Sequence, residues 1–258
     1  MNDALVRTRK EGRIGWITLH RPEAMNTFTL PFADQLDQAL RRMEDDPEVT
    51  VVVVDAAGKN YCTGIALEQF TPRTQREYRE LLHRIDAFYR TLARMRTVTI
   101  AAVQGYAVAN GAGLAFACDL TIAAETARFG TTAINVGLIC LGPAAAMARL
   151  IGRKKAAELL LTGELVSAAD ALALGLVNRV VPEASLADEA LKLAQKLAAK
   201  SPLALRIGKE GLNRLPDLPA LERIDLADDL FATLAATEDA VEGVSAFLGK
   251  RAPTWKER

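Results

Sequence analysis

The feature that most constrains this fold is a stretch rich in small residues between positions 99 and 137. It reads as a strand-like run (Thr99–Val103), a small-residue turn (Gln104–Ala112), a short apolar run (Gly113–Cys118) and a second strand-like run (Asp119–Ala123). Small residues let the backbone approach a ligand closely, because no bulky side chain intervenes. A loop that opens into a helix also presents free N–H groups. The stretch therefore predicts either an anion-binding turn or a tight strand-to-helix turn without a ligand.

If the turn binds an anion, an oxyanion fits better than a phosphate. A P-loop carries a lysine followed by serine or threonine at the start of its helix. Gln104–Ala112 contains none of these residue types.

A second run predicts the kind of sheet. Val49–Asp55 is almost continuously β-branched, which is typical of a strand buried on both faces, and hence of a parallel sheet surrounded by helices. The polar loop Ala56–Leu67 leaves the carboxyl end of this strand. Ligands bind at that edge in open α/β sheets, so the loop is a candidate binding segment.

The other patterns predict an α/β core followed by helices. Leu5–Leu19 reads as a hairpin, Pro31–Glu44 as a helix capped by Thr29, and Thr74–Met95 as one long amphipathic helix. From Glu183 onward the chain is almost wholly helical in pattern. A helical C-terminal part is expected to begin near residue 195.

Composition excludes several functional classes. The 258 residues include 32 Lys and Arg and 32 Asp and Glu, so the net charge is zero, which argues against a nucleic-acid partner and a polybasic membrane patch. The sequence has no apolar run of 18 residues and no signal-peptide core, so a cytoplasmic protein is expected. Cys62, Cys118, Cys140, His20 and His83 are widely spaced, so neither a disulfide framework nor a metal site is expected.

Six segments together resemble the crotonase superfamily, whose best-known members are enoyl-CoA hydratases and isomerases. The resemblance spans nearly the whole chain, with the segments in the family's order. They are Leu19–Phe28, Asn60–Leu67, Ala101–Ala123, Ala127–Leu138, Ala156–Pro182 and Ala246–Lys256.

The resemblance implies an α/β fold, a crotonase-like spiral of ββα turns with two roughly perpendicular sheets. Residues 1–195 would form this core, and residues 196–258 a C-terminal helical trimerisation region. The implied assembly is a homotrimer or a dimer of trimers. The implied ligand is an acyl-CoA thioester, with no cofactor beyond the CoA moiety of the substrate.

The resemblance also implies an oxyanion hole. By match to the family's motifs, the backbone amides of Ile65 and Asn110 would hold the thioester oxygen. Such N–H dipoles stabilise the charge that builds on this oxygen, each by roughly 3 kcal/mol.

CoA contacts carry over from the same motifs. Ala24 and Met25 match the pantetheine and phosphate contact, and the carbonyls of Thr63 and Ile65 match the adenine contacts. The pair Phe247 and Lys250 matches an aromatic-x-x-Lys element on the C-terminal helix, which reaches CoA in some members from a neighbouring subunit. Alternatively, Phe247 is a core aromatic residue and Lys250 a solvated helix-end residue.

The sequence departs from the family at the residues that hydrate double bonds. Enoyl-CoA hydratases of this family use two glutamates as general acid and base. Gly113 and Ala133 stand at these positions, and neither can transfer a proton. Ala66 replaces the family's usual Asp, and Cys140-Leu141 replaces a frequent Pro-Gly. Restoring both glutamates is expected to recover some hydration.

Three interpretations remain open. In the first, the chain is an active crotonase, such as an isomerase, hydrolase or decarboxylase, which uses another residue for proton transfer. The candidates for that residue are Asp86, where some members carry a catalytic His, together with His83, Glu80, Thr132, Tyr106 and Cys140. In the second, the chain is a catalytically silent acyl-CoA-binding subunit. In the third, it is a weak enoyl-CoA hydratase.

Overall fold

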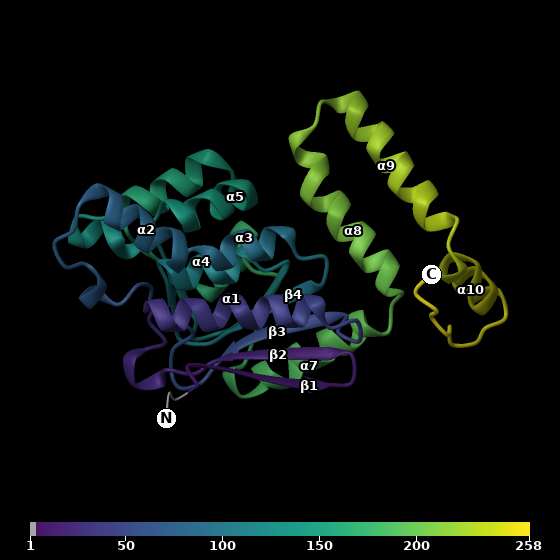
Figure 1. The fold of residues 1–258 in the computed structure, drawn as a ribbon, viewed down its shortest axis with the longest axis horizontal. Helices are drawn as coiled ribbons and strands as arrows, with labels where there is room; N and C mark the ends of the chain where they lie inside the picture. The colour runs from purple at the N-terminus through teal and green to yellow at the C-terminus, as the bar shows by residue number, and fades with distance from the viewer. Residues whose placement is uncertain (1–3) are drawn as a thin grey trace.

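The fold is built on two sheets, seen in a computed structural model that describes residues 4–258 (Figure 1). The larger sheet has the strand order β1-β2-β3-β4-β6-β9, in which β1 and β2 form an antiparallel hairpin and the other neighbours are parallel. The smaller sheet has the order β5-β7-β8. The strands are β1 (Val6–Glu11), β2 (Ile14–Leu19), β3 (Val51–Ala56), β4 (Val98–Val103), β5 (Tyr106–Val108), β6 (Leu120–Ala124), β7 (Arg128–Gly130), β8 (Leu165–Ser167) and β9 (Arg179–Val181).

Alternating side chains of β3 enter two separate cores. Val52 and Val54 belong to the larger core, whereas Val51 and Val53 pack in a smaller one with residues of α7 (Leu186–Ala198). All four valines are fully buried. The prediction of a parallel sheet covered on both faces is therefore confirmed, with α7 on one face and α1 (Leu30–Asp45) on the other.

The predicted cap of α1 is present. The Thr29 hydroxyl accepts a hydrogen bond from the backbone N–H of Phe32, which satisfies one of the free amides of the first turn.

The prediction of one continuous helix over Thr74–Met95 is wrong at Asp86. The chain forms α2 (Gln75–Ile85) and α3 (Ala87–Arg94), and Asp86 between them has φ −92° and ψ 14°. The amphipathic pattern continues through the break, so periodicity could not reveal it. The Asp86 side chain does not cap α3 and instead bonds across to α4 (Asn110–Ala117).

The predicted turn Gln104–Ala112 contains a strand. Its middle forms β5, which pairs with β7 in parallel and so starts the second sheet. Past Ala112 the chain continues through α4, α5 (Leu141–Thr162) and α6 (Ala168–Leu174). Gly152 interrupts α5 with φ 75° and ψ 160°.

The C-terminal helices project from this body (Figure 1). They are α8 (Pro202–Arg214), α9 (Ala220–Ala235) and α10 (Glu238–Leu248). The buried Lys209 of α8 anchors the arm, because its ammonium lies 2.7 Å from Asp119 Oδ2 and donates to the carbonyl of Thr97. The predicted boundary at residue 195 falls inside α7, which packs on the larger sheet.

Within residues 4–258, no helix combines the length and apolarity that a membrane crossing requires. The same residues contain three cysteines, and all of them are buried and free.

Candidate active site

Two loops that follow neighbouring parallel strands pair with each other. The N–H of Cys62 donates to the Tyr106 carbonyl at 3.1 Å, and the N–H of Val108 donates to the Cys62 carbonyl at 3.0 Å. Because β3 and β4 are parallel, both loops lie at the carboxyl edge of the larger sheet. The sequence predicted ligand binding at this edge, and the pairing brings the region of Ile65 to the start of α4.

Two glycines allow this close approach. A Cβ on Gly111 would lie 2.0 Å from the Cys62 carbonyl oxygen, which no side chain could tolerate. A Cβ on Gly64 would lie 2.8 Å from Ala109 Cβ and 3.8 Å from Asn110 N. The residue before Ile65 therefore packs directly against the first turn of α4.

The amides of Ile65 and Asn110 are available to a ligand. Among residues 4–258, neither N–H donates a backbone hydrogen bond. Asn110 is the first residue of α4, where the helix dipole favours negative charge. Ala109 before it has φ 49° and ψ −123°, a conformation that favours glycine and costs about 1–3 kcal/mol for other residues. Such strain is typical of a functional turn.

Asp86 lies directly beside this turn. The Asn110 side-chain amide donates a hydrogen bond to Asp86 Oδ1 at 2.8 Å. Burial raises the pKa of the Asp86 carboxyl, while the Asn110 hydrogen bond and the Arg90 charge oppose that rise. A raised pKa makes the carboxylate a stronger base, so Asp86 beside this helix N-terminus is a candidate for proton transfer.

Tyr89 fills the space beside Gly113, the residue that the motif resemblance matched to the family's first glutamate. A Cβ on Gly113 would lie 1.6 Å from the Tyr89 hydroxyl oxygen and 3.1 Å from Pro143 Cγ. The hydroxyl is buried and has no hydrogen-bond partner among residues 4–258. Sequence reasoning missed this residue, although the missing side chain at Gly113 left a space that some neighbour had to fill.

Ala133, which the motif resemblance matched to the family's second glutamate, lies beside the thiol of Cys140. The backbone of Ala133 hydrogen-bonds to this thiol, and burial raises the thiol's pKa. The adjacent Thr132 is half-buried at the start of a short 3₁₀-helix, Thr132–Val136. The two glutamate positions thus lie next to a phenol and a thiol.

Three other candidates lie outside this cluster. Glu80 is exposed and paired with Arg76 at 3.0 Å, and Tyr106 is 44% exposed. His83 is also exposed on α2. It lines a cavity of about 450 Å³ that also reaches Asp86 and Arg90.

The residues matched to CoA contacts fall into two groups. Ala24 and Met25 lie against the first loop, because the N–H of Thr63 donates to the Met25 carbonyl at 3.2 Å. Phe247, at 82% exposed, and Lys250 lie on or just after α10, which sits near the start of α8 and away from α4 (Figure 1). A single chain therefore does not bring the two groups together.

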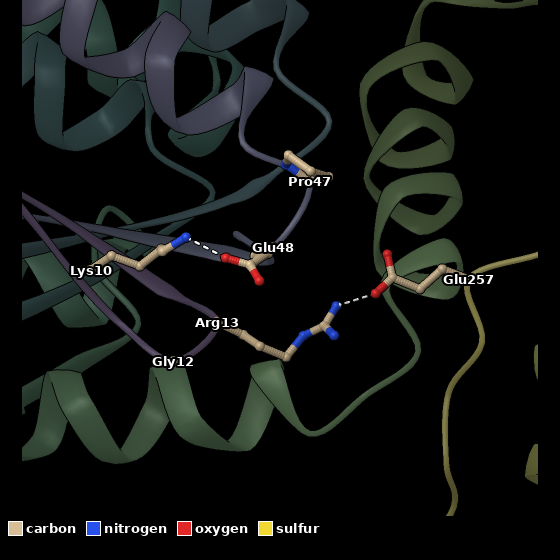
Figure 2. Close-up of a pocket in the computed structure, with 6 residues that line it drawn as sticks. All are labelled: Lys10, Gly12, Arg13, Pro47, Glu48 and Glu257. Atoms are coloured by element: carbon tan, nitrogen blue, oxygen red, sulfur yellow. Dashed lines mark hydrogen bonds and ion pairs between the residues drawn. The ribbon is translucent and has the colours of Figure 1, made fainter.

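Another cavity, of about 650 Å³, lies at the opposite edge of the sheet (Figure 2). It is lined by the β1–β2 turn, the start of β3 and the C-terminal tail. Figure 2 shows that its charged groups pair with one another, Lys10 with Glu48 and Arg13 with Glu257, each at 2.6 Å. Because these charges are already neutralised, the cavity is not a candidate active site. Among residues 4–258, no cluster of His, Cys, Asp or Glu could hold a metal ion.

Comparisons with known proteins agree with this architecture. The family model described as enoyl-CoA hydratase/isomerase matches residues 9–258. A probable enoyl-CoA hydratase of Mycobacterium bovis is 36% identical over 250 residues, covering 96% of each chain. A putative enoyl-CoA hydratase of Thermus thermophilus is 39% identical over 248 residues, covering 95% of this chain and 98% of its own.

The fold comparison gives the same family. The crystal structure of an enoyl-CoA hydratase from Mycobacterium smegmatis superimposes with a TM-score of 0.94 at 37% identity, covering 97% of this chain and 98% of that one. The chain therefore belongs to the enoyl-CoA hydratase/isomerase family of the crotonase superfamily, and its fold is the crotonase fold.

Proposed function

We propose that this chain binds an acyl-CoA thioester and removes a proton from the carbon next to the thioester carbonyl, in a reaction other than hydration. The observation that carries the proposal is the hydrogen bond between Asp86 and the side chain of Asn110. It fixes a half-buried carboxylate beside an amide that is free to bind an oxyanion. Double-bond isomerisation passes through the enolate that this proton removal forms. Decarboxylation would reach an enolate by release of CO₂ and would use the same two amides. Thioester hydrolysis would use the same amides for a tetrahedral oxyanion.

In the proposed mechanism, the amides of Ile65 and Asn110 donate to the thioester oxygen. Asp86 accepts the proton from the α-carbon, and the electron pair of that C–H bond moves into the enolate. Negative charge then develops on the oxygen held by the two amides, where fixed dipoles stabilise it without reorganisation. His83 and Thr132 would act on the rim of this site rather than at the reacting carbon.

A silent acyl-CoA-binding protein is the second candidate. The observation that favours it is the loss of both glutamates at Gly113 and Ala133. A weak enoyl-CoA hydratase is disfavoured by the same loss, since general acid–base catalysis contributes roughly 10²–10⁴-fold.

The first test is calorimetry with octanoyl-CoA and acetoacetyl-CoA, which are both expected to bind. Incubation with octanoyl-CoA in D₂O is then expected to exchange deuterium into its C2 position, as read by mass spectrometry. Binding without exchange would favour the silent protein, and absence of any binding would refute the proposal. Hydration of crotonyl-CoA is expected to be negligible.

CoA itself is proposed to lie along the first loop. The carbonyls of Thr63 and Ile65 accept no backbone hydrogen bond among residues 4–258, so they are free to accept from an adenine amino group. Ala24 and Met25 would contact the pantetheine and phosphates. Phe247 and Lys250 would reach this ligand from a neighbouring subunit, because in their own chain α10 lies away from α4 (Figure 1).

The arm supports a homotrimer or a dimer of trimers. Leu221, Ile224 and Phe231 form an apolar stripe on α9 and are 76%, 58% and 72% exposed. Exposed apolar stripes of this kind mark association surfaces. We propose that other copies of the chain cover this stripe.

The F231D variant is expected to dissociate the assembly, because a buried unpaired carboxylate in the interface is costly. Light scattering during gel filtration should give three or six times the 27.9 kDa chain mass for the native protein, and a smaller mass for the variant. T233D introduces the same charge on another exposed face of α9 and serves as the control. A native protein that elutes as a monomer would refute the assembly.

The cytoplasmic location stays a prediction.

A further inference from the structure

Two contacts with α4, made by Asp86 and by Tyr89 of α3, place Tyr89 at the site. Asp86 meets Asn110, and Tyr89, three residues later, meets Gly113, three residues after Asn110. A spacing of three residues is about one turn, or about 4.5 Å along a helix axis. The Tyr89 hydroxyl therefore lies about one turn along α4 from the amide proposed to hold the thioester oxygen.

An acyl chain that runs along α4 from this amide would bring its third carbon, two bonds beyond the carbonyl carbon, close to the hydroxyl. The hydroxyl is fully buried and unpaired in the ligand-free protein. A buried hydroxyl without a partner is unfavourable, and a purely hydrocarbon acyl chain would leave it unpaired. An oxygen on the acyl chain would pair with it.

We infer that Tyr89 is a specificity-determining residue, whose hydroxyl hydrogen-bonds to an oxygen carried by the acyl chain near its third carbon. The inference rests on the proposed function and adds to it a preference for acyl-CoA thioesters whose acyl chain carries such an oxygen. Burial raises the pKa of the Tyr89 phenol well above its usual value, and the neighbouring Asp86 charge adds to this effect. The phenol therefore stays protonated at neutral pH and can donate.

Tyr61 provides a matched comparison. Its hydroxyl is also buried and unpaired among residues 4–258, but it is enclosed within the larger core. An unpaired hydroxyl alone therefore does not indicate a ligand. What distinguishes Tyr89 is its place at the missing glutamate and one turn from Asp86 and Asn110.

Calorimetry with two esters of equal chain length tests the inference. Butyryl-CoA has no oxygen on its third carbon, whereas 3-hydroxybutyryl-CoA has one. The native protein is expected to bind 3-hydroxybutyryl-CoA roughly two- to tenfold more tightly, the effect of one net hydrogen bond. Y89F is expected to bind both esters alike, and Y61F is expected to keep the native preference.

The outcomes separate the inference from the proposed function. If neither ester binds, both the specificity role of Tyr89 and the proposed function are refuted. If the native protein binds both alike, or if Y89F retains the preference, the specificity role is refuted while acyl-CoA binding stands. A urea unfolding curve completes the test, because Y89F is expected to be at least as stable as the native protein. A marked loss of stability would mean that the hydroxyl has a structural partner, which would overturn the inference.

Discussion

The G113E variant is expected to lose at least about 3 kcal/mol of stability instead of gaining a catalytic carboxylate. A Cβ at this position would lie 1.6 Å from the Tyr89 hydroxyl oxygen and 2.7 Å from its Cζ. Overpacking of this kind forces side chains off their rotamers, and the added carboxylate would be buried beside a neutral phenol. The free energy of unfolding in urea measures the loss.

The recovery of hydration by restored glutamates stays a prediction, and this steric conflict makes it depend on the size of residue 89. Tyr89 must be shortened first, so the G113E cost is expected to fall by roughly 1–3 kcal/mol in a Y89A background, as measured by a double-mutant cycle. G208E is the matched control, because no atom lies within 4 Å of a Cβ at this exposed helical position. It should gain roughly 0.5 kcal/mol from helix propensity. Equal costs of G113E in both backgrounds would contradict the steric explanation.

Short-range patterns determined most of the fold that the sequence could predict. The β-branched run of β3 predicted burial on both faces, and Thr29 predicted the start of α1. Both predictions depend on local chemistry, which periodicity and capping report directly. The break at Asp86 could not be predicted, because the bond that accompanies it reaches Asn110, 24 residues away along the chain.

The sequence likewise predicted some parts of the candidate site and could not predict others. The small-residue turn indicated free amides, and family motifs located them at Ile65 and Asn110. The departure at Gly113 was visible, but the sequence could not show what occupied the vacated space. That answer came from Tyr89, which belongs to another helix and carries no local signal of its role.

The D86N variant is expected to slow deuterium exchange at C2 of a bound acyl-CoA by roughly 10²–10⁴-fold, while its affinity for the ester stays near the native value. Asparagine keeps the shape of the side chain, and its carbonyl oxygen can still accept the hydrogen bond from Asn110. What is lost is the ability to take up a proton. The native exchange rate should rise with pH through a pKa above the usual value of an aspartate, since burial raises the pKa of Asp86. That limb of the profile should be absent in D86N.

D86N is expected to raise the stability of the protein although it lowers the exchange rate. A carboxyl whose pKa is raised by folding binds protons more tightly in the folded state, so its contribution to stability falls as pH rises from the unfolded pKa through the folded one. D86N removes this loss and is expected to be more stable than the native protein at pH 7, with little difference at pH 3, where the carboxyl is protonated in both states.

E80Q changes a carboxylate exposed on α2 and should alter neither exchange nor stability appreciably. A structural role for Asp86 predicts the reverse pattern, with D86N less stable and exchange unchanged. The combination of lost exchange and gained stability would therefore identify Asp86 as a base that the fold retains at a cost to its own stability.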